Sequence, residues 1–378
     1  MAILTEEQTM LRDAAKTWVA QKSPVSAFRK LRDSGAIDGF DPAVWAEMCE
    51  MGWAGILIPE SHGGSGLGYL TLGLVLEETG RTLTASPLVS TALASTTALL
   101  LGGSESQRSE WLPQFANGKA LGALAVDEGF HHAPHQIALK AARDGSGWRL
   151  NGRKTFVLDG GAAQILVVAA RTAGAPDETQ GVTLFLVRAD APGISRQKLH
   201  SVDSRGVANI VFEAVSVGSD AVLGAPDSGF GVLDATLDRT RAGLAAEMLG
   251  ASLQSFDVTL EYLKTRTQFG QVIGTFQSLQ HRAAKMFTEL ELTRSSIEAA
   301  LEAFDGNAND VAALASLAKA RANDTAHLVS SEMVQMHGGI GMTDVHDAGL
   351  YLKRARVTEA AYGSAAFHRD RYARLMGY

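Results

Sequence analysis

A polar and aromatic stretch between two helical patterns holds the side chains best suited to bind a charged cofactor. Arg266 is a fixed cation whose guanidinium fork suits a pyrophosphate, Phe269 offers a flat ring, and Gln268 and Gln277 offer amides. The helix after this stretch would present free backbone N–H groups, which favour an anion. The stretch therefore indicates a site for a phosphate-bearing aromatic cofactor. The alternative is a helical hairpin whose arginine caps the preceding carbonyl groups.

Two long amphipathic segments position this stretch. Apolar residues recur every three or four positions before it, as at Leu233 and Leu244, and after it, as at Met286 and Leu290. Further helical patterns cover residues 311–336, 346–356 and 364–375. Helices of this length with short connections predict an antiparallel bundle over residues 224–378. His337, at the end of one helix, is expected to be a hydrogen-bonded structural residue.

The beginning of the chain, residues 1–119, also predicts helices. Thr5 and Gln8 have the spacing of a capping box, and Asp41 with Pro42 opens another helix. Two more helices are expected over residues 70–83 and 87–101. The glycine-rich segment 61–68 is not followed by a Gly-Lys-Ser/Thr sequence, so we interpret it as a turn where helices approach closely.

The middle of the chain, residues 120–223, changes to a period of two. Strands are expected over residues 120–126, 135–143, 147–158, 163–171, 181–189 and 208–217. Their spacing is typical of a small antiparallel barrel or sandwich, and Asn151-Gly152 predicts a hairpin turn. The fold class is therefore α+β and multidomain: a helical domain, a middle β domain and a helix bundle.

Composition excludes several classes of protein. The net charge of −7 argues against a nucleic-acid surface, and Cys49 is the only cysteine, so neither an internal disulfide nor a thiolate metal cluster is expected. The first residues do not resemble a signal peptide, and no apolar run predicts a membrane span. A cytoplasmic protein is the expectation.

Three ordered motifs carry a resemblance to a known family. The sequence R-x-Q-F-G from Arg266, followed by F-Q-x-x-Q-x-x-x-A-x-M, resembles the acyl-CoA dehydrogenase signature. The segment QMHGGIG, residues 335–341, resembles the later flavin motif of that family, and IPESHGGSG, residues 58–66, resembles its N-terminal signature. The resemblance implies FAD, three domains, and a tetramer whose flavin sites are completed across a subunit interface.

The resemblance also implies which residues contact the flavin. They are Arg266, Gln268, Phe269, Gln277, Gln335, Gly338, Gly339, Val126, Glu128, Phe156, Leu158 and Ser364. The sequence departs from the family at some of these positions. Asp127 replaces a common threonine, Phe156 replaces an indole, and Leu158 replaces another threonine. The loss of hydroxyl groups would weaken hydrogen bonding to the flavin.

The family's Gly-Ser-Asp segment, which touches the thioester part of CoA, is replaced here by GFHHAPH, residues 129–135. His131, His132 and His135 raise the possibility of a metal site, but no carboxylate follows at helical spacing. We interpret the segment as a mobile surface loop that shapes the substrate entrance. No metal is expected.

The chemistry of the family needs a carboxylate base. A proton is removed α to the thioester, and a hydride passes from the β-carbon to flavin N5. The family places a glutamate at one of two positions, which match Thr240 and Tyr362 here. Neither residue can act as a base at neutral pH, because a tyrosine with a pKa near 10 is almost wholly protonated. Asp238, Arg241 and Gly363 match substrate-binding positions.

Glu247 is the remaining candidate for the base. It lies seven residues after Thr240, on nearly the same helical face, and interrupts an apolar run. The alternative is a structural glutamate paired with an arginine or lysine of a neighbouring helix, such as Arg282. Asp238 and Asp127 are weaker candidates.

Three functions remain open at this point. The leading one is FAD-dependent α,β-dehydrogenation of an acyl-CoA thioester, with an electron-transfer flavoprotein as acceptor. The second is a non-catalytic or half-site subunit, in a heterotetramer whose related partner chain supplies the base. The third is another flavin reaction, such as nitroalkane oxidation or monooxygenation. The sequence specifies neither the acyl chain of the substrate nor whether the tetramer is a homotetramer or a heterotetramer.

Overall fold

A computed structural model describes residues 3–306, 308 and 310–378 of the chain. The chain forms two compact units. The first, which we call the helical unit, comprises Met1–Lys30, Tyr69–Thr84 and Arg241–Tyr378. The second, the sheet unit, comprises Leu31–Gly68 and Ala85–Thr240. This division groups the chain differently from the three predicted domains, whose boundaries stay a prediction. Among the described residues, no helix has the length and apolar character needed to span a membrane.

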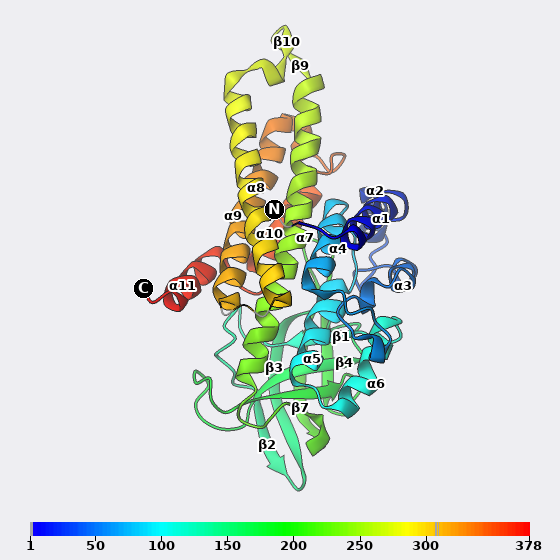
Figure 1. Ribbon diagram of the computed structural model, residues 1–378, viewed down its shortest axis with the longest axis vertical. Helices are drawn as coiled ribbons and strands as arrows, with labels where there is room; N and C mark the ends of the chain where they lie inside the picture. The colour runs from blue at the N-terminus through cyan, green and yellow to red at the C-terminus, as the bar shows by residue number, and fades with distance from the viewer. Residues whose placement is uncertain (1–2, 307, 309) are drawn as a thin grey trace. The chain divides into compact units, whose positions relative to one another are not determined.

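Long helices dominate the helical unit, and α9 packs against α8, α10 and α11 (Figure 1). The unit contains α1 (Glu6–Lys22), the start of α2 (Val25–Asp33), most of α4 (Gly68–Arg81), most of α7 (Phe230–Thr265), α8 (Gln277–Asp305), α9 (Val311–His337), α10 (Ala348–Ala360), α11 (Ala365–Leu375) and the short helices η5 (Ile273–Thr275) and η6 (Gly338–Met342). The predicted bundle is confirmed. The sequence also predicts a turn at residues 307–310, between the second and third long helices, and this turn includes residues outside the described ones.

Local sequence explains where several helices of this unit begin. The Thr5 hydroxyl accepts the Gln8 amide at 3.2 Å, and the Gln8 side chain accepts the Thr5 amide, so the predicted capping box is confirmed. The Asp305 carboxylate, at the end of α8, accepts the amides of Tyr69 and Leu70 at 2.7 and 3.0 Å. A carboxylate at a helix N-terminus is favoured by the helix dipole, so the end of α8 stabilises the start of α4.

Two glycines let α4 and α7 pack backbone to backbone. A Cβ at Gly80 would lie 2.1 Å from the carbonyl oxygen of Glu247, and one at Gly250 would lie 1.8 Å from that of Glu77. In the glycine-rich loop 61–68, by contrast, a Cβ at Gly64 would meet the nearby Ile58 carbonyl oxygen at 2.1 Å. The same Cβ would lie 2.5 Å from the carbonyl oxygen of Gly55, in the short helix Trp53–Gly55. Our expectation that the loop lets helices approach closely stays a prediction.

The sheet unit holds the β structure and a smaller set of helices. The helices are α3 (Pro42–Glu50), α5 (Thr96–Gly102), α6 (Glu105–Ala116), η1 (Trp53–Gly55), η2 (Glu60–His62), η4 (Ser219–Ala221) and the π-helix η3 (Leu88–Ser95). The strands are β1 (Gly122–Ala125), β2 (Lys140–Asp144), β3 (Gly147–Leu158), β4 (Ile165–Arg171), β5 (Val182–Arg188), β6 (Ile194–His200), β7 (Gly206–Val217) and β8 (Val222–Leu223).

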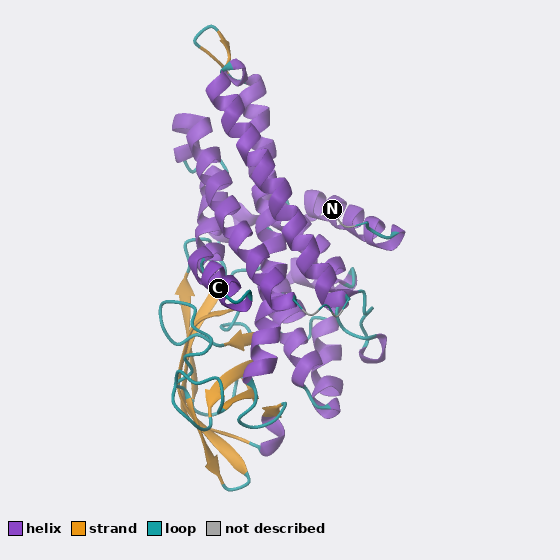
Figure 2. Ribbon diagram, turned by 60° about the vertical axis from the view of Figure 1, so that its left-hand side comes forward, coloured by secondary structure: helices purple, strands orange, loops and turns teal. Residues whose placement is uncertain are grey.

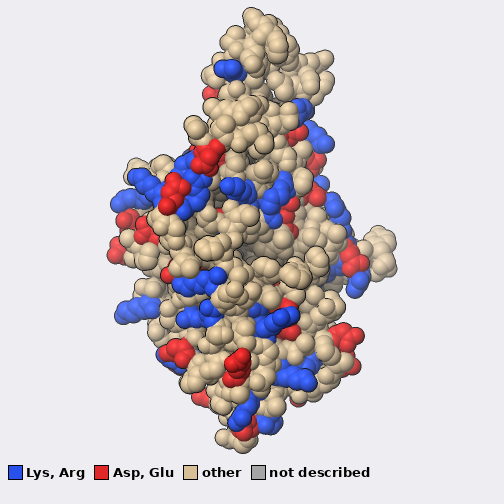
Figure 3. All heavy atoms as spheres, turned by 180° about the vertical axis from the view of Figure 1, so that it is seen from behind, with Lys and Arg blue, Asp and Glu red and all other residues tan. Residues whose placement is uncertain are grey.

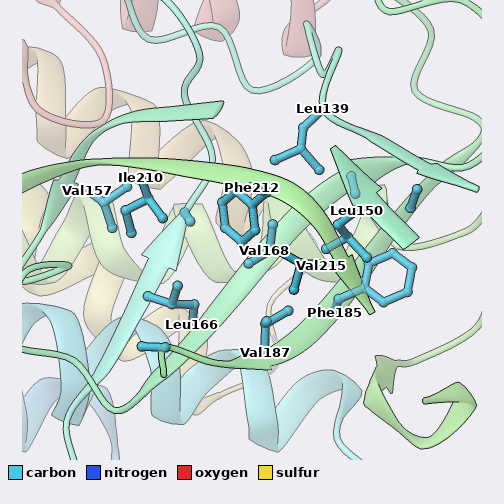
Figure 4. Packing of buried hydrophobic residues seen from close by; sticks show 14 of the residues in the cluster. Leu139, Leu150, Val157, Leu166, Val168, Phe185, Val187, Ile210, Phe212 and Val215 are labelled. Carbon is cyan, nitrogen blue, oxygen red and sulfur yellow. The ribbon is translucent and has the colours of Figure 1, made fainter. Parts of the chain in front are cut away.

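These eight strands form one mixed sheet in the order β6-β7-β3-β2-β4-β5-β8, with β1 paired to β4. Most neighbours are antiparallel, whereas β4 runs parallel to both β1 and β2. Side chains from β3, β4, β5 and β7 gather into one apolar cluster, which includes Leu150, Val168, Phe185 and Phe212 (Figure 4). The predicted α+β fold class is confirmed, with an antiparallel-rich sheet in the middle of the sequence.

The hairpin turn predicted at Asn151-Gly152 is wrong. Both residues lie inside β3, and the turn between β2 and β3 is at Gly145 and Ser146. At the β3 irregularity the Asn151 side chain accepts the Ala214 amide at 2.8 Å. A Cβ at Gly152 would lie 2.9 Å from the Leu139 Cα. The glycine therefore serves a close approach of two backbones rather than a turn.

Other elements had weaker sequence signals. Strands β6 and β8 and helices α2 and α6 were not predicted. The most polar of these, β6 (ISRQKLH), pairs with β7 along its whole length. Its side chains lack the alternation that marks a strand with one buried face, because most of them are exposed or half-buried.

Candidate cofactor and substrate site

The stretch singled out from the sequence forms a small β-hairpin at the end of α7 and α8 (Figure 2). Strand β9 (Thr267–Gln268) pairs with β10 (Gln271–Val272), and Phe269 and Gly270 form the turn with φ values of 54° and 80°. Two left-handed residues are typical of the tight type I′ turn. The sequence indicates a helix end, a short loop and a helix start here, and the structure shows that the connection is a hairpin. The hairpin leaves Phe269 88% exposed.

The end of α7, just before the first motif, contacts the second motif of the helical unit. Tyr262, just before the hairpin, stacks on His337 with ring centroids 4.4 Å apart. His337 Nδ1 donates to the Met333 carbonyl at 2.7 Å, as expected of a hydrogen-bonded histidine at a helix end, whereas its buried Nε2 has no hydrogen-bond partner among the described residues. Burial lowers the pKa of His337, so the ring is neutral at pH 7. Gly338 and Gly339 follow directly, and a Cβ at either position would meet open space.

The remaining residues of this group are exposed. Arg266, Gln268, Gln277 and Gln335 all present their side chains to solvent in the helical unit. Amides, a guanidinium and an aromatic ring that are exposed to solvent are groups that suit a flat, phosphate-bearing molecule. The residues present in this unit therefore fit the adenine and pyrophosphate part of a dinucleotide.

In the sheet unit, the segment after β1 and the end of β3 lie together. The Thr155 amide donates to the Asp127 carbonyl at 2.8 Å, and Lys154 Nζ donates to the Val126 carbonyl at 2.8 Å. The register of β3 against β7 shifts between Lys154 and Val157, and Phe156 has a left-handed φ of 52°. This bulge turns the Phe156 ring outward, where it is half exposed. Leu158 lies beyond it on the same strand.

The carboxylate of Glu128 is engaged inside the sheet unit. It accepts the buried Lys154 ammonium at 2.7 Å and the amides of Ala138 and Leu139 at 2.9 and 3.0 Å. Burial lowers the pKa of Lys154, while Glu128 acts in the opposite direction. The Glu128 side chain therefore holds the 126–139 loop, and only its backbone is available to a ligand.

Asp127 and His132 form a second polar pair in this loop. His132 Nδ1 lies 2.9 Å from the Asp127 carboxylate, and the Ala133 amide donates to it at 3.1 Å. The His132 side chain is 3% exposed, so our prediction of a surface loop is wrong for this histidine. Among the described residues, no group of three or more His, Cys, Asp or Glu side chains is placed to hold a metal ion.

We predict that Asp127→Asn destabilises the protein by about 1.5–3 kcal/mol at pH 7, the usual value of a charge-assisted hydrogen bond. Burial alone would raise the pKa of Asp127, but the hydrogen bonds from His132 and Ala133 outweigh it and the pKa is lowered. The carboxylate therefore stabilises the folded state above its unfolded pKa of about 3.9. This stability is lost as the pH falls through the lower folded-state value.

Thermal melts of both proteins from pH 7 down to pH 3 check this prediction. The difference between wild type and Asp127→Asn should shrink below about pH 4, where the wild-type carboxylate begins to take up a proton. A difference that stays constant across the range would show that the charge of Asp127 does not stabilise the loop.

A pocket of about 710 Å³ lies beside this loop within the sheet unit. Its polar wall includes Glu128, His131, Arg153 and Asp177, and its apolar wall includes Leu139. Arg171 holds the neighbouring 173–180 loop, because its guanidinium donates to the carbonyl groups of residues 137, 173, 176, 178 and 180. The pocket thus has walls that are fixed by buried polar groups.

Thr240 and Tyr362, the two positions predicted for the catalytic base, hold no acidic residue. Their side chains lie in different surroundings. Thr240 is buried in α7, and its hydroxyl donates to the Thr236 carbonyl at 2.8 Å. Asp238 is buried in the same helix. Tyr362 lies in the turn between α10 and α11. Arg241 Nε donates to the Tyr362 carbonyl at 3.3 Å. Two predicted substrate residues of the helical unit, Arg241 and Gly363, therefore meet at this turn.

Glu247 is paired inside the helical unit. It is 7% exposed, and its Oε1 accepts Arg354 Nε at 3.0 Å and Arg354 Nη2 at 2.7 Å. The expected structural partner, Arg282, is wrong, because Arg282 forms an ion pair with Glu332 instead. The geometry of Glu247 matches the structural alternative, with Arg354 of α10 as the partner.

Comparison with known families matches nearly the whole chain. Residues 5–119 match the model "Acyl-CoA dehydrogenase, N-terminal domain", residues 127–215 the middle domain and residues 227–377 the C-terminal domain. This chain belongs to the acyl-CoA dehydrogenase family. The resemblance drawn from the three motifs is thereby confirmed, as is the expected enzyme class, an acyl-CoA dehydrogenase-like oxidoreductase.

Similar proteins cover almost the whole length of this acyl-CoA dehydrogenase family member. The mitochondrial isovaleryl-CoA dehydrogenase of Pongo abelii is 31% identical, over 97% of this chain and 88% of the relative. The solved butyryl-CoA dehydrogenase of Megasphaera elsdenii is 25% identical with a TM-score of 0.92, over 100% and 99% of the two chains. The steroid ACAD Tcur3481-Tcur3483 is 31% identical with a TM-score of 0.88, over 98% of each chain.

Several polar residues around the site were missed in the sequence. Arg354, Lys154 and Lys319 are buried cations, and each binds oxygen atoms of a neighbouring segment. Lys319 interrupts the apolar run ALASLAKA of α9, much as Glu247 interrupts its own run. A charge within an apolar stripe was therefore the available signal, but spacing alone does not show which groups satisfy it.

Proposed function

We propose that this protein catalyses the FAD-dependent α,β-dehydrogenation of an acyl-CoA thioester. The observation that supports this most is that the chain matches all three family domains, while Tyr262, four residues before the first flavin motif, packs against His337 of the second. When bound, FAD supplies the hydride acceptor. The chain's own residues bind and orient it.

The proposed FAD contacts divide between the two units of the chain. In the helical unit they are Arg266, Gln268, Phe269, Gln277, Gln335, Gly338, Gly339 and Ser364. In the sheet unit they are Val126, Glu128, Phe156 and Leu158. Since the Glu128 carboxylate is engaged with Lys154, we assign its contact to the backbone. Ser364 caps α11 through its hydroxyl, which accepts the Phe367 amide at 3.3 Å.

We predict that Arg266→Ala weakens FAD binding about ten- to a hundredfold, because it removes a charge-assisted contact to the pyrophosphate. The measurement is flavin content after purification, together with the rate of flavin release. Lys264→Ala is the matched control, since Lys264 is an exposed cation two residues earlier that pairs with Glu261. Unchanged flavin release in Arg266→Ala, or an equal loss in the control, would contradict the assignment.

For the substrate, we propose that Asp238, Arg241 and Gly363 contact the acyl-CoA near its thioester. The 710 Å³ pocket beside residues 128–139 is a further candidate for part of the CoA, because its loop replaces the family's thioester-contacting segment. His131 and Arg153 give that pocket donors for an anionic or polar group. The acyl chain itself is not assigned.

The missing base favours a second candidate function. Thr240 and Tyr362 are not acids, and the carboxylate of Glu247 is bound by Arg354. We therefore infer that this chain is either slow on its own or one half of a heteromeric enzyme in which a related chain supplies the base. One similar structure, the steroid ACAD Tcur3481-Tcur3483, has a name that joins two components. This likeness supports the heteromeric alternative.

We further propose a tetramer, with an electron-transfer flavoprotein as acceptor. Apolar side chains are exposed near the proposed FAD site: Phe269 is 88%, Met342 79% and Val345 86% exposed. The end of the helical unit that carries the hairpin shows few charged side chains (Figure 3). Such a surface is typical of one that a further subunit covers.

Anaerobic mixing of the flavin-loaded protein with acyl-CoA thioesters tests the proposal. Bleaching of the flavin by a thioester supports dehydrogenation by this chain. Bleaching only after co-expression with a homologous chain supports the half-site function. Oxygen consumption without any CoA substrate would instead indicate another flavin reaction, and would overturn the proposal.

A further inference from the structure

A cluster of buried polar groups surrounds the turn of residues 361–364 in the helical unit. Lys319, in the middle of α9, is 0% exposed. Its ammonium donates to Asn323 Oδ1 at 2.6 Å, to the Thr358 carbonyl at 2.8 Å and to the Gly363 carbonyl at 3.3 Å. All three acceptors are neutral oxygens. A buried cation is unfavourable unless its hydrogen bonds are satisfied, so this arrangement needs a reason.

The turn itself has an unusual backbone. Tyr362 has a left-handed φ of 55° and Gly363 has a φ of 117°. For a residue other than glycine, such a conformation persists only where its surroundings impose it. A Cβ at Gly363 would lie 2.6 Å from the Phe367 ring, so this position accepts only glycine without rearrangement.

Buried side chains lie within hydrogen-bond distance of two backbone carbonyl groups of the turn, those of Tyr362 and Gly363. The Tyr362 carbonyl accepts Arg241 Nε at 3.3 Å and lies 3.1 Å from His368 Nε2. The Gly363 carbonyl accepts Lys319 Nζ and also Asn323 Nδ2, the latter at 3.1 Å. Lys319 and Asn323 are four residues apart and therefore lie on one face of α9. One rigid helix thus supplies both donors to Gly363.

We propose that Lys319, together with Asn323, is a positioning residue that fixes the 361–364 turn and so places Tyr362 and Gly363. The Thr358 carbonyl, near the end of α10, is bound by the same ammonium, so one group joins α9, α10 and the turn. The consequence for catalysis rests on the proposed function, in which Tyr362 and Gly363 face the substrate. The holding of the turn does not depend on it.

The electrostatics agree with this role. Burial, together with the positive charge of Arg241, lowers the pKa of Lys319 to about 7, while Glu359 acts in the opposite direction. The neutral amine has two N–H donors for three acceptors, so the charged form is the one that can satisfy all three. A location next to another buried cation, Arg241, is electrostatically unfavourable for Lys319. Packing alone would therefore not explain a lysine at this position.

Hydrogen–deuterium exchange of the flavin-loaded protein tests the proposal. The reporters are the amides of Ala361 and Gly363, which bond to the carbonyl groups of Val357 and Ala360. In Lys319→Met, which keeps the length of the side chain but not its donors, we expect their exchange to accelerate about ten- to a hundredfold. Amides in the middle of α8 should change much less.

Thr325→Val is the matched control. Thr325 is also buried on α9, and its hydroxyl bonds to that of Thr293 at 2.8 Å, away from the turn. This variant loses a buried polar contact of the same helix, so its turn amides should exchange at the wild-type rate. Equal acceleration in both variants, or no acceleration in Lys319→Met, would overturn the proposal.

Asn323→Ala provides the test if Lys319→Met does not fold. It removes one donor to Gly363 and leaves the lysine in place, so we expect a smaller, several-fold acceleration at the same amides. Unchanged exchange in this variant would overturn the proposal. The positioning role and the proposed function can fail separately. If the turn amides exchange faster only in the Lys319 and Asn323 variants, but no acyl-CoA reduces the flavin of the protein, the positioning role is supported and only the proposed function is contradicted.

Discussion

Replacing Glu247 by glutamine should destabilise the protein by about 3–5 kcal/mol, the usual consequence of breaking a buried ion pair and leaving one charge unpaired. The carboxylate accepts two guanidinium hydrogen bonds from Arg354, and both side chains are about nine-tenths buried. Glutamine has nearly the same shape but no charge to balance the guanidinium. Chemical denaturation of the flavin-loaded protein measures the loss.

The same variant separates the structural role of Glu247 from a catalytic one. If Glu247 only holds α7 to α10, the folded fraction of Glu247→Gln should reduce its flavin at the wild-type rate in stopped-flow bleaching. If Glu247 removes the α-proton, the rate should fall about a hundred- to ten-thousandfold with the fold intact. The Arg354 contacts lead us to expect the first result.

Two controls make the expected loss of stability specific. Glu289→Gln breaks an ion pair with Arg321 in the same bundle, whose members are each 32% exposed, so it should cost less than about 1 kcal/mol. The double variant Glu247→Met with Arg354→Met removes both charges, and much of the stability should return. A Glu247→Gln protein as stable as the wild type would contradict the buried-pair interpretation.

Sequence patterns predicted the elements of this fold better than its polar contacts. Periodicity located the long helices, and the Thr5–Gln8 spacing located a cap, because both depend on residues close in the chain. The Asn151-Gly152 turn failed because the glycine there responds to Leu139, a residue distant in sequence. Strand β6 was missed because its polar side chains do not alternate.

The candidate site shows the same limit. Motif matches singled out the R-x-Q-F-G stretch and the Gly338-Gly339 pair, and in the structure their chain neighbours Tyr262 and His337 pack against each other. The exact charge partner, in contrast, was not predictable: an arginine or lysine of a neighbouring helix was expected for Glu247, with Arg282 as the example, and the partner is Arg354. A pair between helices depends on how the helices are rotated and shifted, which local spacing does not specify.

Introducing a carboxylate at position 362, one of the two positions predicted for the catalytic base, should raise the rate of flavin reduction, whereas Glu247→Gln should lower stability. We expect Tyr362→Glu to accelerate anaerobic flavin reduction by acyl-CoA about a hundred- to ten-thousandfold over the wild-type chain expressed alone, the usual contribution of a general base. A protonated tyrosine hydroxyl is a poor proton acceptor at pH 7, whereas an ionised glutamate can accept a proton. The measurement is stopped-flow bleaching at pH 7 and above.

The gain should depend on the carboxylate and on the fixed turn. Because buried donors hold the carbonyl groups of Tyr362 and Gly363, the new side chain would start from a defined backbone. Tyr362→Gln, which has the shape of glutamate without its basicity, should stay as slow as the wild type, and Tyr362→Phe should change little. If glutamate and glutamine behave alike, position 362 does not face the α-proton. If the wild type alone is already fast, this chain contains its own base and the half-site function is wrong.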